Sequence, residues 1–164
     1  MAVGQSLFAT DAKGMILPGS SMATWGKRNN HPVLKFDAAS TETAYYEGIL
    51  PTTYDGGSIT VDIDWMAATA TTGNVIWSVA IERMQVGTGD LDSDGFASAV
   101  TGSASAAPGT SGVMQRTSIQ ITGGNLDSLA EGERFRLQVN RLGGNGSDTM
   151  AGDAELLGVY GRES

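Results

Sequence analysis

Alternating carboxylates near the middle of the chain could bind a cation. Asp90, Asp92 and Asp94, followed by Gly95, match the first half of a calcium-binding loop, in which alternate oxygen ligands converge on one ion. The twelfth position of such a loop supplies a bidentate Glu, but this chain has Thr101 there. We therefore expect an exposed loop and no bound metal, and we keep Asp90, Asp92 and Asp94 as the alternative ligands.

Two further patterns have features of catalytic sites. Asp62 and Asp64 share one face of a predicted strand, about 6.5–7 Å apart, a separation that fits the two carboxyls of an inverting glycosidase. No apolar pocket is predicted around either carboxyl, as a general acid would need. Ser111 follows Gly109 by two residues but lacks the last glycine of a G-x-S-x-G motif, and His31 is the only histidine. We expect a protein that is not an enzyme and has no cofactor.

The composition excludes several other classes. The chain has 164 residues, 10 Lys and Arg against 18 Asp and Glu, a formal net charge of −8 and no cysteine. It is long enough for one domain, and it can form neither a disulfide framework nor a Cys-ligated zinc site. The acidic balance argues against nucleic-acid binding. With no apolar run of 18 residues and no signal-peptide pattern, we expect no membrane contact and synthesis in the cytoplasm without export.

The elements that must position these side chains are strands. Apolar and polar residues alternate in Ile59–Trp65, Val75–Met84 and Arg134–Asn140, which is typical of strands with one buried face. Shorter strands are expected at Val33–Phe36, Ala44–Ile49, Phe96–Val100, Ile119–Ile121 and Ala154–Tyr160. Turns rich in Gly, Pro and Asn separate them, and no long segment has a helical pattern. The sequence predicts an all-β fold, an antiparallel β-sandwich of about eight strands, and a jelly roll fits this pattern best.

Aromatic side chains are candidates for sugar binding, because their faces can stack on a pyranose ring. Trp65 and Trp77 occupy apolar positions of their strands, so we expect them in the core. Trp25 lies outside the alternating segments and suits an anchoring role. The stacking candidates are therefore Tyr45, Tyr46, Tyr54 and Tyr160, which nothing in the sequence aligns.

Residues 1–30 differ from the rest of the chain. They show no sustained alternation, and they carry a net charge of +2, so residues 31–164 carry −10. We interpret residues 1–30 as an extended docking arm on a jelly-roll domain at residues 31–164. The candidate contact residues are Lys13, Met15, Ile16, Leu17, Trp25, Lys27 and Arg28. The alternative is that this segment packs across its own sandwich.

Short segments between residues 28 and 160 form one ordered set. They are Arg28–Phe36, Tyr46–Pro51, Tyr54–Gly57, Ile59–Trp65, Gly73–Trp77, Ala80–Arg83, Asp92–Asp94, Pro108–Thr110, Gly132–Leu137 and Asp148–Asp153. In this order the segments resemble a group of virion proteins from tailed bacteriophages. The resemblance implies a jelly-roll domain, commonly trimeric, that serves as a capsid decoration (cement) protein or as a head or tail fibre. It implies no catalytic or binding residues.

The lack of a shaft favours decoration over a fibre. Fibres usually add heptad or collagen-like repeats, and this chain has neither. We therefore expect a structural protein on the capsid surface of the virion, with the major capsid protein and itself, as a homotrimer, for partners. The alternative function is a head or tail fibre module that binds a host surface glycan or receptor.

Overall fold

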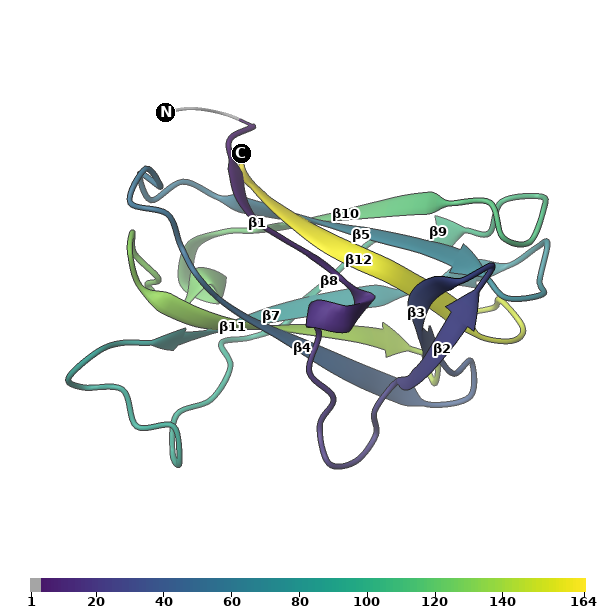
Figure 1. Ribbon diagram of the computed structural model, residues 1–164, viewed down its shortest axis with the longest axis horizontal. Helices are drawn as coiled ribbons and strands as arrows, with labels where there is room; N and C mark the ends of the chain where they lie inside the picture. Colours follow the sequence, from purple (N-terminus) through teal and green to yellow (C-terminus); the bar gives the residue numbers. More distant parts are fainter. Residues whose placement is uncertain (1–3) are drawn as a thin grey trace.

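Two antiparallel sheets are built on the alternating segments of the sequence. The computed structural model describes residues 4–164, and Figure 1 shows most of its strands running roughly along the long axis of the molecule, with the hairpin at residues 24–36 steeply inclined to it. The larger sheet has the order β10 (Gln115–Ile121), β5 (Ile59–Ala67), β12 (Ala154–Glu163), β3 (His31–Phe36), β2 (Thr24–Arg28), and β1 (Ser6–Asp11) also pairs with β12. The smaller sheet has the order β4 (Thr41–Ile49), β11 (Arg134–Leu142), β7 (Trp77–Met84), β8 (Val100–Thr101).

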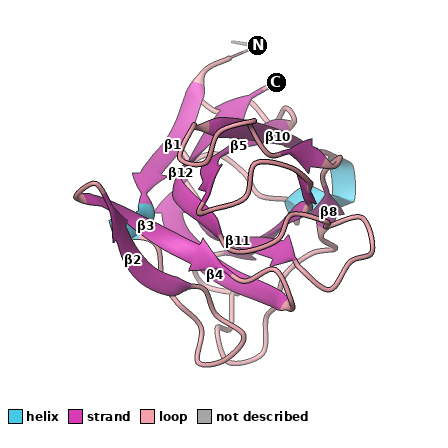
Figure 2. Ribbon diagram, turned by 90° about the vertical axis from the view of Figure 1, so that its right-hand side faces the viewer, coloured by secondary structure: helices cyan, strands magenta, loops and turns pink. Residues whose placement is uncertain are grey.

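The two sheets stack into a sandwich, which Figure 2 shows from one end. A short ladder joins β6 (Asn74–Val75) to β9 (Ser105–Ala106), and two 3-10 turns, η1 (Ala12–Gly14) and η2 (Gly123–Leu126), connect strands. The predicted antiparallel β-sandwich is confirmed. The two large sheets hold ten strands rather than about eight, because β1 and β2 come from residues without alternation. No helix within residues 4–164 is long and apolar enough to cross a membrane.

Trp65 and Trp77 lie in the core between the sheets, as their strand positions predict. Both side chains are fully buried, and their ring centroids are 6.2 Å apart. The indole N–H of Trp65 donates a hydrogen bond of 2.9 Å to the hydroxyl of Thr117, and the ring of Trp77 meets Phe36 edge-on. Facing side chains of β5, β7, β11 and β12 form much of the rest of the core.

The strand β1 pairs with β12 through five register positions between Ser6 and Asp11. The ring of Phe8 lies directly over Gly161 of β12, where an added Cβ would come within 2.1 Å of the ring. Phe8 also stacks on Tyr46 and contacts Phe135 in the opposite sheet. This N-terminal strand is therefore part of the sandwich core.

The residues that follow η1 cover the free edge of β4. Ile16 and Tyr45 exchange two backbone hydrogen bonds of 2.7 and 2.8 Å. The backbone N–H of Thr43 donates to the carbonyl of Ser21, and the carbonyl of Thr43 accepts from the N–H of Ala23. Paired backbone on an edge strand protects it from pairing with other chains. The N-terminal segment thus packs on its own sandwich, as the alternative interpretation predicts.

The proposed boundary between residues 30 and 31 falls in the turn of the β2–β3 hairpin, so the two ranges share one sheet. Residues 1–3 of the proposed arm lie outside the described residues. A docking role for residues 1–30 stays a prediction.

Candidate functional site

The indole of Trp25 lies at the surface, beside a hollow of about 400 Å³ on the outer edge of the larger sheet. Lys13, Gly26, Lys27 and Pro32 complete its lining. The Trp25 side chain is 51% exposed, and among residues 4–164 it is the one aromatic side chain in the exposed class. No other described aromatic ring contacts it. About half of the Trp25 side chain is therefore accessible to a ligand.

A tight hairpin orients Trp25 and Lys27. Asn29 and Asn30 form the two-residue turn between β2 and β3, with φ values of +46° and +67°. Both values lie in the left-handed region, as a type I′ turn requires, and Asn tolerates this region better than most residues. Trp25 and Lys27 are two residues apart in β2, so their side chains leave the same face of the strand.

Lys13 reaches the hollow from η1. The carboxylate of Asp11 accepts hydrogen bonds from the backbone N–H groups of Lys13, at 2.9 Å, and of Gly14, at 3.2 Å. This cap fixes the start of the turn, and η1 packs against β3, which carries Pro32. Among the described residues, the ammonium of Lys13 forms no ion pair.

The other predicted contact residues are used inside the fold. Met15 is buried and Leu17 packs against the core, whereas Ile16 is exposed beside Tyr45. The guanidinium of Arg28 is bonded to Glu155 at 2.9 Å and to two backbone carbonyls of β5 and the following loop. Of the seven candidates, the structure thus brings three together at one surface: Lys13, Trp25 and Lys27.

The candidate metal ligands lie in the exposed loop between β7 and β8. Asp90 accepts a hydrogen bond from the backbone N–H of Asp92, and Asp94 accepts one from the backbone N–H of Asp90. These bonds shape the turn from within, as Asx turns do. In the described part of the chain, no three His, Cys, Asp or Glu side chains are grouped so that they could hold a metal ion.

The paired carboxylates of β5 each face an arginine. Asp64 forms a bidentate pair with Arg116, at 2.6 and 2.8 Å, and Asp62 is bonded to Arg162 at 3.0 Å. Asp62 also accepts a hydrogen bond from Ser118. These two side chains therefore tie β5 to β10 and β12 across the outer face of the sheet.

The tyrosines offer less free surface than the sequence suggested. Tyr54 is buried, and Tyr46, which is half-buried, stacks on Phe8. Tyr45 stacks on Phe96 with centroids 5.6 Å apart, and the guanidinium of Arg136 lies 4.8 Å from the Tyr45 centroid. The sequence analysis named Trp25 as an anchoring contact residue but not as a stacking candidate. The Asn29-Asn30 turn is the signal that could have indicated its place on an edge strand.

Comparison with known proteins defines the class of fold. No family model matches the chain, and no curated protein sequence matches it. The CBM22-1 xylan-binding domain of Xyn10C from Paenibacillus barcinonensis matches with a TM-score of 0.52 and 10% identity, over 99% of this chain and 97% of that one. The xylan-binding module CBM15 matches with a TM-score of 0.52 and 10% identity, over 96% of this chain and 97% of that one. The protein is an all-β jelly-roll sandwich of the kind found in these modules.

These findings correct the function expected from the sequence. The resemblance to phage virion proteins predicted the jelly roll, which is confirmed, but no family model supports the virion family. The expected function as a capsid cement protein is wrong: the two solved structures described above, which share the fold over nearly their whole length, are named as xylan-binding. The major capsid protein and a homotrimer as partners have no support. A location on the virion surface stays a prediction.

Proposed function

We propose that this protein is a carbohydrate-binding module that holds a sugar ring against Trp25. The observation that carries the proposal is the 51% exposed indole beside a hollow of about 400 Å³. Exposure of a large aromatic side chain is unfavourable in water, and an aromatic face with neighbouring polar groups suits an amphipathic ligand. A pyranose ring presents such an apolar face of C–H groups and an edge of hydroxyls.

Strand pairing and a capped turn hold the backbone at the hollow, which also supports binding. Trp25 is anchored by the register of the β2–β3 hairpin, in which it lies opposite Leu34, a fully buried residue. Pro32 has a fixed φ, and Lys13 follows a capped turn. A site that is formed before binding loses less conformational entropy when the ligand arrives.

The fold comparison supports the same class of ligand. The two similar structures described above are named as xylan-binding, and the present chain covers nearly all of each. The alternative function expected from the sequence, a fibre module that binds a host surface glycan, has the same class of ligand. The role is binding without catalysis, since the carboxylates of β5 are engaged by Arg116 and Arg162.

The test is binding of the full chain to a panel of polysaccharides, with xylan, mannan and cellulose as neutral members and acidic polymers included. Affinity electrophoresis identifies ligands, and calorimetry measures affinity on soluble oligosaccharides. We expect Trp25→Ala to weaken binding at least tenfold. The matched control is Ile49→Ala, which removes a side chain that is 55% exposed elsewhere on the surface and should leave affinity unchanged.

Two results would contradict the proposal. If the wild-type chain binds no member of the panel, the protein is not a carbohydrate-binding module. If Trp25→Ala binds as tightly as the wild type, the sugar lies on another surface. Circular dichroism of each variant confirms that the fold is retained, so a loss of affinity reports on the site.

A further inference from the structure

Most of the positive charges of this protein are neutralised by neighbouring carboxylates. With a formal net charge of −8, acidic side chains are in excess. Within residues 4–164, six of the seven arginines form ion pairs with Asp or Glu. These are Arg28–Glu155, Arg83–Glu133, Arg116–Asp64, Arg136–Glu82, Arg141–Asp148 and Arg162–Asp62.

The lysines differ from the arginines. The chain has three of them, Lys13, Lys27 and Lys35, and within the described residues none forms an ion pair. Lys13 and Lys27 both line the hollow beside Trp25. Two lysines that form no ion pair among the described residues therefore lie beside one exposed indole, in a protein with a net negative charge.

Lys35 occupies the other face of the same hairpin. Its aliphatic chain crosses Gly26, where an added Cβ would come within 2.5 Å of Lys35 Cε. Because successive side chains of a strand point to opposite faces, this contact is on the face away from Trp25 and Lys27. Lys35 thus carries the same charge as Lys27 in the same hairpin, but on the face opposite to the Trp25 indole.

We infer that the sugar bound at Trp25 is acidic, with a carboxylate or sulfate group held by Lys13 and Lys27. This inference rests on the proposed function. Hydrogen bonds from an ammonium to an anionic oxygen are about twice as strong as neutral ones. A neutral sugar would leave both ammonium groups without a counter-charge, whereas an acidic sugar uses the ring platform and both cations together.

The net charge of the protein makes this arrangement selective. A polyanion approaching most of the surface meets like charge, which lowers its rate of association away from the hollow. The two lysines offer a local positive region beside the stacking platform. An acidic polysaccharide should therefore bind in one place and one orientation, and its affinity should fall as salt screens the charges.

The test uses pairs of polymers that share a sugar backbone and differ in their anionic groups. Polygalacturonate and its methyl ester test the carboxylate, and carrageenan and its desulfated form test the sulfate. We expect the full-length protein to bind at least one acidic member at least tenfold tighter than its neutral partner in low salt. Preference within the first pair assigns a uronate, and preference within the second assigns a sulfate ester.

Lysine variants locate the effect. Lys27→Gln and Lys13→Gln should each weaken binding to the preferred acidic polymer at least fivefold, and so reduce its preference over the neutral partner. Lys35→Gln is the matched control, since it changes the net charge by the same amount on the other face of the hairpin. It should alter affinity for the acidic polymer by less than twofold.

The outcomes separate this inference from the proposed function. If neutral polymers bind as tightly as acidic ones and Trp25→Ala abolishes binding, the carbohydrate-binding function stands and the acidic preference is overturned. If the acidic polymer is preferred but Lys35→Gln weakens it as much as Lys27→Gln, general charge and not this site explains the preference. If no polymer binds, both proposals fail.

Discussion

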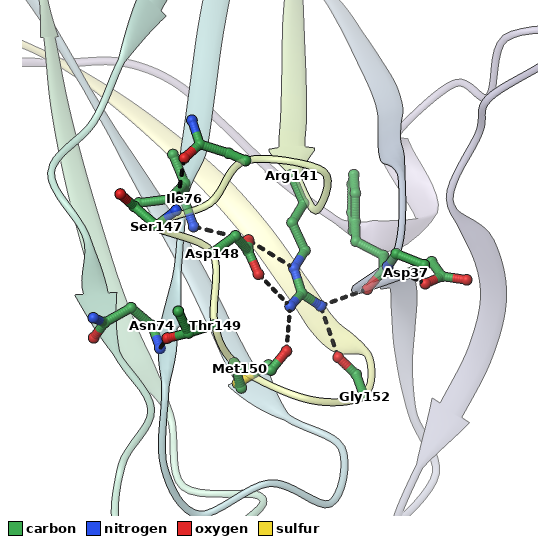
Figure 3. A network of polar contacts seen from close by, with 12 residues as sticks. Asp37, Asn74, Ile76, Arg141, Ser147, Asp148, Thr149, Met150 and Gly152 are labelled. Carbon is green, nitrogen blue, oxygen red and sulfur yellow. Dashed lines mark hydrogen bonds and ion pairs between the residues drawn. The ribbon is translucent and has the colours of Figure 1, made fainter.

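Arg141 and Asp148 form a bidentate ion pair in which both side chains are completely excluded from solvent. Arg141 also donates to the backbone carbonyls of Phe36, Met150 and Gly152, at 2.8–3.0 Å, and Asp148 accepts from the backbone N–H of Ile76. Figure 3 shows the guanidinium at the centre of these contacts. One arginine thus joins β11, β3 and the loop that leads into β12.

This pair should be essential for stability. Asp148→Asn leaves the buried guanidinium without its counter-charge, so we expect a loss of about 3–5 kcal/mol in the free energy of unfolding, measured with denaturant. The control is Arg116→Gln, which removes an exposed pair with Asp64 and should cost less than about 1 kcal/mol. A similar small loss for both variants would show that the buried pair is dispensable.

The N-terminal segment should be required for folding. Leu7, Phe8 and Met15 are buried, and each such side chain contributes roughly 1.5–3 kcal/mol, so together they rival the net stability of a typical domain. We expect deletion of residues 1–23 to abolish cooperative thermal unfolding by circular dichroism. The milder variant Phe8→Ala should lose about 3–5 kcal/mol, while Val86→Ala, on a 95% exposed side chain, should lose less than about 0.5 kcal/mol.

A deletion product with an unchanged melting temperature would contradict this prediction. It would mean that residues 1–23 are a separable arm. Retained stability in Phe8→Ala would further show that the contact with Gly161 is incidental.

Acid should weaken the contact between Glu133 and Arg83. Two hydrogen bonds from the Arg83 guanidinium, at 2.6 and 2.7 Å, hold the pKa of the Glu133 carboxyl below its ordinary value of 4.5. A carboxyl whose pKa is lower in the folded state stabilises the fold above its unfolded pKa, and this contribution disappears as pH falls through the folded value. The stability difference between wild type and Glu133→Gln should therefore be constant above pH 6 and shrink below pH 4.5.

Urea unfolding at a series of pH values measures this difference, and Glu131→Gln, at an exposed neighbouring position, is the control. A difference that stays constant or grows with acid would show that Glu133 is not stabilised by its ion pair.

Several features of the fold follow from the sequence by itself. A period of two shows which side chains share a face, so the alternation in Ile59–Trp65 and Arg134–Asn140 predicts strands and places Trp65 in a core. Asp62 and Asp64 fall on the opposite face for the same reason. These are local properties, and burial of one face is sufficient to explain them.

Only the tertiary structure shows that residues of the N-terminal segment form the strands β1 and β2 of the larger sheet. The partners of β1 and β2 lie far along the chain or across a turn, and backbone pairing depends on the shape of the finished sheet more than on local composition. The same holds for the site. Lys13 and Trp25 line one hollow because η1 packs on β3, while the chain between them covers the edge of β4. Only the assembled sandwich brings these segments together.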